Sequence, residues 1–332
     1  MALTNTKHYS LFVVVSAFTA LSLLAGCASL PSEPSAVTQD RADRIPLATS
    51  PPSAPLSAPQ TQTERAVHYS NVWDRIRAGL SLPTLNSPLI ARHEQWFVNN
   101  PEFMDAMLGR SRLYLYHIVE EVEKRGMPME IALLPAIESA YKPYAYSRAK
   151  ASGLWQFIPS TGRLYGLHAN WWYDGRRDVL ASTQAALDYL EKLNSDFNGD
   201  WQLALASYNC GEGKVGRLLE ANRRKGLPMT YSGLTNSLPR ETQHYVPKLM
   251  AFVNIVSDPA KYGVQLPPIP NQPYFERVDA GSQIDLGVVA RLTDLPVTEL
   301  YQINPGHSRC SHQIHLKFYL SQLAPNLYFP EI

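Results

Sequence analysis

The sequence predicts a mainly α-helical domain followed by a small α/β module. Apolar residues recur at helical spacing through the middle of the chain, helix-capping residues precede several of these runs, and strand-type alternation is scarce. Proline-rich stretches bracket this middle part. With 332 residues, of which 45% are hydrophobic and 18% are charged, the chain is long enough for one or two domains and can bury a core.

The N-terminus has the layout of a secretory signal. Lys7 precedes the apolar run Leu11–Leu24, and about 14 residues are too few to span a bilayer comfortably. The run leads into the pentapeptide LLAGC, which ends at Cys27 and resembles the bacterial lipobox, where the cysteine thiol receives a lipid. We therefore expect residues 1–26 to be a lipoprotein signal peptide. Ala28 follows where lipoproteins kept at the inner membrane typically carry Asp, so the lipobox implies an outer-membrane lipoprotein facing the periplasm of a Gram-negative bacterium.

The distribution of the 26 prolines divides the rest of the chain. Seven of them lie in Pro31–Pro59 among Ser, Ala and Thr, a composition that cannot pack, and we expect residues 27–70 to be an extended tether. Four more lie in Leu266–Pro273, which predicts a linker over residues 265–275. The helical domain is then expected over residues 71–264.

The first predicted helices are defined by apolar spacing and by proline. Four apolar residues recur at helical spacing within Ser111–Lys124, namely Leu115, Ile118, Val119 and Val122. Pro128 suits the first turn of a second helix that continues through Ile137. Pro135 is expected to kink or end that helix, because proline removes a backbone donor and clashes with the preceding turn. Glu138 should therefore lie near a helix terminus.

Two further helices are predicted from their caps. Asp178 precedes an apolar-periodic run that reaches Leu193, and Asp200 precedes the run Trp201–Asn209, which Gly211 can end. The stretch GEGKVG that begins at Gly211 spells a dinucleotide-binding pattern, but a helix precedes it where that fold requires a strand. We interpret it as a helix cap and a tight turn.

Composition excludes several classes of protein. A formal net charge of +1 argues against nucleic acid as a partner. The cysteines, Cys27, Cys210 and Cys310, fit neither a disulfide framework nor a zinc site, and the histidines form no H-E-x-x-H pair. No G-x-S-x-G elbow is present, and Cys210 has no recognisable histidine partner, so we interpret it as a packing residue. We therefore expect neither a metal nor another cofactor.

Glu138 is the strongest candidate for catalysis. It ends the otherwise apolar stretch ALLPAIE, and apolar surroundings raise the pKa of a carboxyl group because they disfavour its charged form. A raised pKa is what a general acid needs near neutral pH. The alternative is an exposed surface glutamate.

Aromatic and amide residues gather in the segments that follow Glu138. Gly153–Gln156, Trp171–Tyr173 and Ala206–Asn209 combine rings with amide side chains, a combination that suits a polysaccharide groove in which rings stack on sugars and amides bind hydroxyl and acetamido groups. Core packing is the alternative for each ring, and for Trp201 we prefer it.

Four motifs together resemble the soluble-lytic-transglycosylase family. Glu138-Ser139, GLWQ at 153–156, Tyr208-Asn209 and ETQHYV at 241–246 occur in the order and with the spacing of that family, over residues 131–256. The segments WQFIPSTGR from 155 and DGRRDV from 174 look like its membrane-bound D branch.

The resemblance implies a goose-lysozyme-like α fold and cleavage of the MurNAc–GlcNAc β-1,4 bond of peptidoglycan without water as acceptor. In this family one glutamate acts twice, and Glu138 holds its position. As an acid it protonates the glycosidic oxygen, and as a base it takes the proton of the muramoyl C6 hydroxyl, which closes a 1,6-anhydro ring. The implied partners are glycan strands and, through the lipid, a membrane.

The resemblance also implies substrate-binding residues. Ser147 is expected to orient Glu138 or the acetamido group of the substrate. Further groove positions are matched by Ser139, Gln156, Tyr208, Asn209, Glu241 and Tyr245. Candidates to meet carboxylates of the peptide stems are Lys142, Lys150, Arg176 and Arg177, although an exposed arginine pair is usually only a solvated face.

Two other functions remain open from the sequence. A lysozyme-type muramidase that uses water would need a second carboxylate about 5–9.5 Å from the first. Asp174, Asp178 and Glu241 are candidates, and Asp178 already resembles a helix cap. A tethered peptidoglycan-binding protein without activity is the other alternative, and the presence of Glu138 argues against it.

The C-terminal segment resembles part of a glycan-binding module. Val278–Leu286, followed by Val289, Leu300 and Asn304, is similar to the first half of a LysM module. The returning strand of such a module is not recognisable after Gly306. We therefore expect residues 276–332 to be an incomplete, LysM-like α/β segment.

Overall fold

The computed structural model describes residues 68–279, 284–307 and 317–321. The predicted signal peptide, the lipidation site Cys27, most of the predicted tether and Cys310 lie outside the described residues.

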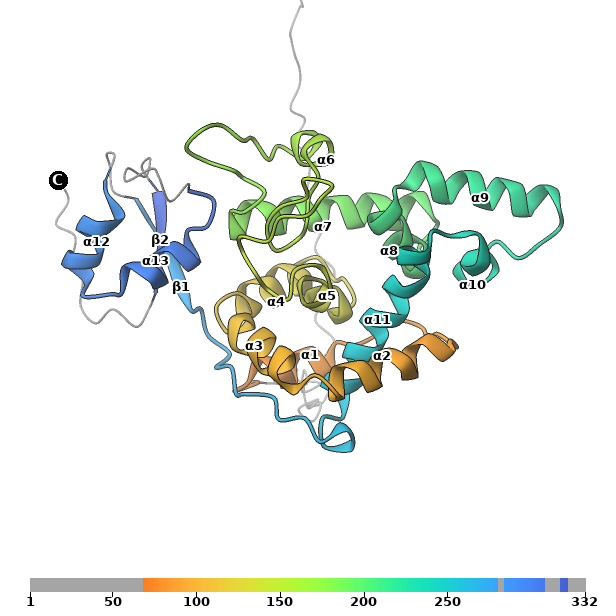
Figure 1. Cartoon of the computed structure of the whole chain (residues 1–332), viewed down its shortest axis with the longest axis horizontal. Helices are drawn as coiled ribbons and strands as arrows, with labels where there is room; N and C mark the ends of the chain where they lie inside the picture. The colour runs from red at the N-terminus through yellow and green to blue at the C-terminus, as the bar shows by residue number, and fades with distance from the viewer. Residues whose placement is uncertain (1–67, 280–283, 308–316, 322–332) are drawn as a thin grey trace, which may run out of the picture. The chain divides into compact units, whose positions relative to one another are not determined.

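The described chain confirms the mainly α-helical class (Figure 1). Its first part contains α1 (Val72–Ala78), α2 (Pro88–Val98), α3 (Pro101–Ser111), α4 (Leu115–Lys124), the 3₁₀ helix η1 (Met129–Leu133), α5 (Leu134–Glu138) and α6 (Pro159–Leu164). Its second part contains α7 (Val179–Asp196), α8 (Trp201–Cys210), α9 (Glu212–Arg224), α10 (Tyr231–Leu234), η2 (Thr235–Ser237), α11 (Arg240–Ser257) and η3 (Ala260–Tyr262).

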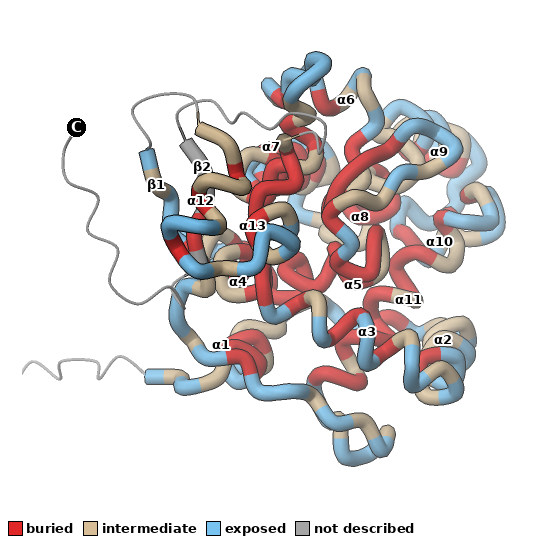
Figure 2. Tube along the Cα trace, turned by 60° about the vertical axis from the view of Figure 1, so that its left-hand side comes forward, coloured by how far each residue is buried: buried red, intermediate tan, exposed pale blue. Residues whose placement is uncertain are grey.

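Helix α11 is the central support of the domain. It packs against α2 along one side and against α8, η1 and α5 along others (Figure 1). Eleven of its residues are buried, and Figure 2 shows the buried stretches of α5, α7, α8 and α11 meeting inside the domain. Burial of these apolar side chains is the main source of stability for such a bundle. The same helix presents its N-terminal half to the cleft described below.

A proline inside α11 is accommodated by a side chain. Pro247 has no N–H, so the carbonyl oxygen of Gln243, four residues earlier, loses its helical donor. The hydroxyl of Tyr231 donates a hydrogen bond to that carbonyl oxygen (3.2 Å). The helix therefore continues past the proline, and the residues on either side of it keep their places.

The segment before Glu138 differs from the single helix that the sequence predicts. Residues Met129–Leu133 form a 3₁₀ helix, and α5 begins at Leu134, with Pro135 in its first turn. The prediction that Pro135 ends a helix is wrong in detail, because proline fits the first turn, where no backbone donor is needed. Glu138 is nevertheless the last residue of α5, as expected.

The predicted caps are confirmed. The side chain of Asp178 accepts from the backbone N–H of Ala181 (2.9 Å) at the start of α7. Asp200 accepts from Leu203 (3.0 Å) at the start of α8. Gly211 ends α8 with a positive φ of +88°, which favours glycine. Gly211 therefore joins α8 to α9, which confirms the predicted helix cap, while the predicted tight turn is wrong, because Glu212–Gly216 form the start of α9.

The second proline-rich segment is packed and is not a free linker. Trp73 donates from Nε1 to the carbonyl oxygen of Pro267 (2.8 Å), and Val72 donates its backbone N–H to the carbonyl oxygen of Ile269 (2.9 Å). Ile269 itself is buried. Part of the segment 265–275 therefore runs along α1, because its apolar residues find partners there.

The C-terminal segment contains a strand that the sequence did not predict. It consists of β1 (Phe275–Asp279), α12 (Leu286–Thr293), α13 (Val297–Ile303) and β2 (Lys317–Ser321). The two strands pair antiparallel, with Phe275 opposite Ser321 and Asp279 opposite Lys317. The apolar alternation of the sequence KFYLS is too short to be recognised from sequence, although Leu320 is buried. The α/β expectation is confirmed, and the LysM likeness stays a prediction.

Among the described residues, no helix has both the length and the apolar character that crossing a membrane would require.

Candidate active site

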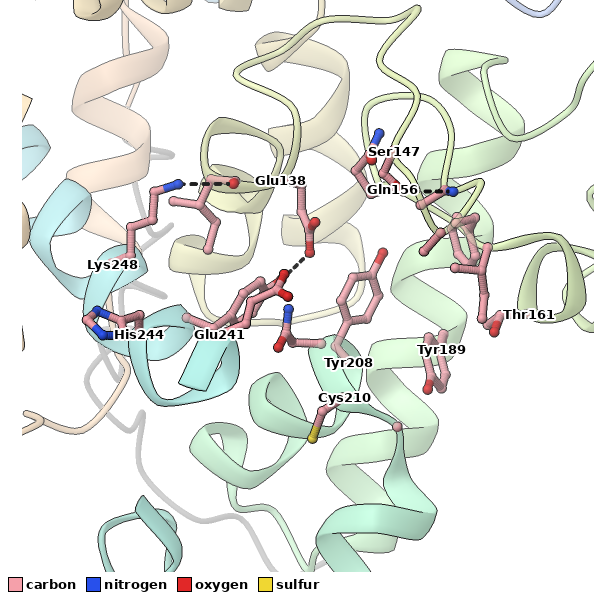
Figure 3. Close-up of a pocket in the computed structure, with 18 of the residues that line it drawn as sticks. Glu138, Ser147, Gln156, Thr161, Tyr189, Tyr208, Cys210, Glu241, His244 and Lys248 are labelled. Atoms are coloured by element: carbon pink, nitrogen blue, oxygen red, sulfur yellow. Dashed lines mark hydrogen bonds between the residues drawn. The ribbon is translucent and has the colours of Figure 1, made fainter. Parts of the chain in front are cut away.

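A cleft of about 890 Å³ opens between the end of α5, the loop after it, α8 and the first half of α11. In Figure 3, Glu138 lies with Lys248 and His244 on one side and Ser147 and Gln156 on the other. A volume of this size accommodates a ligand of several rings.

The local fold places Glu138 at the wall of this cleft. The 3₁₀ helix and the first turns of α5 are buried, and they anchor the segment in the core. The helix then stops, because Ala140 and Tyr141 adopt positive φ angles of 51° and 55° that an α-helix cannot contain. Glu138 is consequently half-buried at the helix end, between an apolar anchor and the open cleft.

Glu138 has the electrostatics of a general acid. Burial of its carboxyl group raises its pKa to about 7, and the carboxylate of Glu241 adds to the increase, while the Tyr245 hydroxyl and the Lys248 charge oppose it. The Tyr245 hydroxyl donates to Oε1 of Glu138 (2.5 Å). Burial also raises the pKa of Tyr245, so this hydroxyl keeps its proton. The carboxyl group is thus oriented by a neutral donor.

The loop between α5 and α6 is held in place by hydrogen bonds of buried side chains. Trp155 is fully buried, and its Nε1 donates to Thr183 Oγ1 (3.0 Å). Arg176 is 8% exposed and donates from Nη1 to the carbonyl oxygen of Lys150 (2.7 Å), while Asp174 binds the rest of its guanidinium through both carboxylate oxygens. Gly153 has φ +84°, and a Cβ there would lie 1.9 Å from the carbonyl oxygen of Arg176.

This loop carries two of the predicted binding residues into the cleft. Ser147 lines the cleft, and its Oγ accepts a hydrogen bond from the backbone N–H of Ala151 (3.1 Å). Its hydroxyl proton has no acceptor among the described residues and can be donated to a ligand. Gln156 also lines the cleft with φ +51°, a strained backbone held by a bond from its Nε2 to the carbonyl oxygen of Gly153 (2.8 Å).

Helix α8 contributes two more predicted residues. Tyr208 donates to the carbonyl oxygen of Trp155 (2.9 Å), and Asn209 Oδ1 accepts from Thr242 Oγ1 (2.7 Å). With its oxygen so occupied, the amide of Asn209 presents its N–H₂ group to a ligand. Burial raises the pKa of Tyr208 well above its ordinary value, so this residue is neutral too.

Helix α11 contributes residues that sequence reasoning missed. Arg240, His244 and Lys248 line the cleft together with the predicted Glu241 and Tyr245. The missed residues are spaced by four, which places them on one face of a helix, and this spacing is the signal from which they were predictable.

Other predicted groove residues lie elsewhere. Ser139 is buried and does not line the cleft; its hydroxyl donates to the carbonyl oxygen of Leu154 (2.9 Å), which ties α5 to the loop. Trp155 belongs to the core, and Trp171 and Trp172 are exposed but outside the cleft lining. Trp201 packs against the core, as we prefer from sequence.

The basic cluster expected to meet peptide stems is also elsewhere. The hypothesis is wrong for Arg176, because its guanidinium is buried against Asp174 and the loop. Lys142, Lys150 and Arg177 do not line the cleft, and Arg177 donates to Ser152 Oγ (2.9 Å).

Of the three candidates for a second carboxylate, only Glu241 lines the cleft. Asp174 is paired with Arg176, and Asp178 caps α7. Within the described ranges, no group of three or more His, Cys, Asp or Glu side chains is arranged to hold a metal ion.

Comparison with known proteins gives the family that this domain resembles. Residues 116–227 match the family described as "Transglycosylase SLT domain". The match covers α5, the loop and α8, and it ends before α11.

Two curated relatives are similar to the chain. The chain is 39% identical over 236 residues to "Membrane-bound lytic murein transglycosylase D" of Escherichia coli K12, covering 71% of this chain and 52% of that protein. It is 47% identical over 123 residues to a "Putative tributyltin chloride resistance protein" of Alteromonas sp. strain M-1, covering 37% of this chain and 59% of that protein. The chain thus spans little more than half the length of these relatives.

A solved structure of lytic transglycosylase Slt from Pseudomonas aeruginosa, an inactive mutant, is 26% identical and covers 46% of this chain and 25% of that chain. Its TM-score is 0.35, which is too low to support an argument about the fold.

Proposed function

We propose that this protein is a lytic transglycosylase that cleaves the MurNAc–GlcNAc β-1,4 bond of peptidoglycan and leaves 1,6-anhydro-MurNAc ends. The observation that carries the proposal is Glu138, a carboxyl group with a pKa raised to about 7, hydrogen-bonded to Tyr245 in a cleft that also presents hydroxyl and amide groups. The SLT domain match and the 39% identity to a lytic murein transglycosylase support it.

In the proposed reaction Glu138 acts first as an acid. Its proton passes to the glycosidic oxygen while the bond from that oxygen to C1 of MurNAc breaks. The carboxylate that remains is stabilised by the hydroxyl of Tyr245 and by the charge of Lys248. Because the pKa of Glu138 is about 7, the acid form is the major one below that pH, and cleavage should slow as the pH rises through it.

Glu138 then acts as a base. It takes the proton of the C6 hydroxyl while that oxygen bonds to C1, so the anhydro ring closes and the glutamic acid is regenerated. Ser147, Gln156 and Asn209 present hydroxyl and amide groups to the acetamido and hydroxyl groups of the sugars. No second carboxylate and no cofactor take part in this scheme.

A lysozyme-type hydrolase is the second candidate, because Glu241 also lines the cleft and could activate a water molecule. The negative charge of Glu241 contributes to the raised pKa of Glu138, after burial, which is the main cause. The two reactions differ in product mass, since an anhydro end is lighter than a reducing end by one water.

The test is digestion of purified peptidoglycan by the full chain, followed by mass spectrometry of the released muropeptides. We expect anhydro ends from the unaltered protein, no cleavage by Glu138→Gln and retained anhydro products with Glu241→Gln. Reducing ends throughout would overturn the transglycosylase in favour of the hydrolase. Cleavage by Glu138→Gln would remove Glu138 from the mechanism, and no cleavage by the unaltered protein would favour a binding protein.

We also propose that the protein works in cell-wall remodelling as an outer-membrane lipoprotein anchored through Cys27. The lipobox-like sequence before Cys27 and the "membrane-bound" relative support this placement. A polymer as large as the cell wall cannot diffuse to an enzyme, and an anchor keeps the cleft beside it.

A further inference from the structure

We propose that the face of α11 formed by Arg240, His244 and Lys248, called here the α11 basic face, binds carboxylates of the peptide stems that branch from the glycan strand. The inference rests on the proposed function, and it adds that peptide-bearing strands are the preferred substrate.

The α11 basic face runs along one wall of the cleft. Its residues are separated by four positions, which is just over one helical turn, so their side chains follow one another along α11. Figure 3 shows Lys248 and His244 across Glu138 from Ser147 and Gln156. A glycan bound at Glu138 therefore has a basic wall on one side and a neutral wall on the other.

Arg240 and Lys248 on this face are not held in ion pairs with other described residues. Lys248 donates from Nζ to the carbonyl oxygen of Ile137 at 3.4 Å, a long and weak bond. Lys248 is half-buried and has no carboxylate of the described chain within ion-pair distance, which is costly for an ammonium group, and a ligand that supplies the anion offsets this cost.

His244, the histidine of the α11 basic face, contacts a second histidine, His93. His93 on α2 and His244 lie with Nε2 and Nδ1 3.1 Å apart, in an edge-on arrangement. Burial and the charges of His244, Lys248 and Arg92 lower the pKa of His93 to about 4, so His93 is neutral near pH 7. His244 is thereby oriented on the α11 basic face between Arg240 and Lys248.

The charge balance favours an anionic group on the substrate. When Glu138 carries its proton, the charged residues that line the cleft are Arg240, Lys248 and Glu241, an excess of one positive charge before His244 is counted. Glycan hydroxyl and acetamido groups are neutral and need no such wall. The groups of peptidoglycan that carry negative charge are the carboxylates of its peptides, and guanidinium and ammonium groups bind carboxylates well.

The experiment compares two substrates for the full chain at about pH 5, where Glu138 is protonated in every variant. One substrate is intact peptidoglycan, and the other is the same material with its peptide carboxylates converted to neutral amides by a carbodiimide and methylamine. We expect the unaltered protein to have the higher kcat/KM on the strands that keep their stem carboxylates. Arg240→Gln should lower the ratio of the two kcat/KM values by about tenfold, the loss of one charge-assisted hydrogen bond, and Lys248→Met by a similar factor.

The controls separate charge from structure. Arg240→Lys should keep most of the preference, because the charge remains, and Arg240→Glu should reduce it below that of Arg240→Gln. Lys225→Gln, which removes an exposed cation at the end of α9, should leave both rates unchanged.

Two different failures can be told apart. If the unaltered protein cleaves both substrates with the same kcat/KM, or if Arg240→Gln leaves the ratio unchanged, the α11 basic face does not bind stems and the proposed function stands. If the unaltered protein cleaves neither substrate, the proposed function itself fails.

Discussion

The carboxyl group of Glu138 is held where ionisation is unfavourable. Burial raises its pKa to about 7 from an ordinary value of 4.5, although Tyr245 and Lys248 both favour the charged form. The fold therefore keeps Glu138 protonated for the proposed acid step. Burial of this carboxyl group lowers the stability of the folded protein at pH values where the group would be ionised in the unfolded chain. Perturbed carboxyl groups of this kind are concentrated at active sites because function retains them.

The loss of stability caused by the raised pKa of Glu138 can be measured without substrate by replacing this residue. A group whose pKa is higher in the folded than in the unfolded state loses stability as the pH rises between the two values. Glu138→Gln removes this loss, so the variant should gain in Tm relative to the unaltered protein as the pH increases from about 4.5 to about 7, and keep the gain above that. Thermal unfolding followed by circular dichroism across this range measures it.

The matched control is Glu102→Gln, which removes an exposed carboxylate from the first turn of α3. It should show no such rise with pH. A flat difference between Glu138→Gln and the unaltered protein over the whole range would mean that the pKa of Glu138 is not raised.

Sequence motifs identify some of these residues and miss others for a physical reason. Glu138, Gln156 and Tyr245 fall in recognisable motifs, and the structure brings them into one cleft. Ser139 shares a motif with Glu138 but points into the protein, because the chain turns sharply after α5. Lys248 belongs to no motif, and only the helical spacing from Arg240 connects it with the cleft.

The loop between α5 and α6 shows how short elements position a site. It has no regular structure over most of its length, and its shape comes from side chains that satisfy its backbone carbonyl groups. Arg176 binds the carbonyl oxygens of Lys150 and Phe157 (2.7 and 3.3 Å), and Tyr208 binds that of Trp155. The DGRRDV motif thus belongs to the support of the cleft, and not to a surface that meets substrate.

Gly153→Ala tests this support. The added Cβ would lie 1.9 Å from the carbonyl oxygen of Arg176, on a backbone with φ +84° that alanine rarely adopts. The loop must move away from Arg176, and we expect a loss of at least about 2 kcal/mol in the free energy of unfolding. The displaced Gln156 and Ser147 should also lower kcat/KM on peptidoglycan. Denaturant unfolding and rate measurements check both.

Gly109→Ala is the matched control within α3. A Cβ there meets nothing within 4 Å, so this change should stabilise the protein by about 0.5–1 kcal/mol through helix propensity. If Gly153→Ala is as stable as the unaltered protein, the contact with Arg176 is not tight.

Helix boundaries were predictable where a cap or an apolar period marked them, as at Asp178 and Asp200. The change from 3₁₀ to α geometry at Leu134 was not, because a proline signals a helix end and a helix start equally well. The short strand β2 escaped prediction because its partner, β1, lies almost forty residues away in the chain and supplies the hydrogen bonds that local patterns do not contain.

The second proline-rich segment of the chain is packed against the helical domain. Proline and small polar residues alone do not distinguish a tether from a packed segment, since both are poor in regular structure. The segment 265–275 contains Ile269, which is buried beside α1, and its carbonyl groups accept hydrogen bonds from Trp73 and Val72. Its prolines therefore shape a packed connection between the helical domain and the C-terminal segment.

Anchoring through Cys27 leads to a prediction for the whole protein. Each buried methylene of a lipid contributes about 0.8 kcal/mol to membrane binding, so several acyl chains hold a protein firmly. The full chain expressed in a Gram-negative host should therefore sediment with membranes, and Cys27→Ser should move to the soluble fraction. Because the cleft is built from residues far along the chain, the rate on detached, solubilised peptidoglycan should be the same for both.

The control for this experiment is Cys310→Ser, which removes a cysteine outside the lipobox-like sequence and should leave the protein with the membranes. Mass spectrometry of the N-terminal peptide should show acyl chains on Cys27 in the unaltered protein. Sedimentation of Cys27→Ser together with the membranes, or an unmodified Cys27, would show that the lipid is not the anchor, since a cysteine without acyl chains contributes none of the binding that the prediction requires.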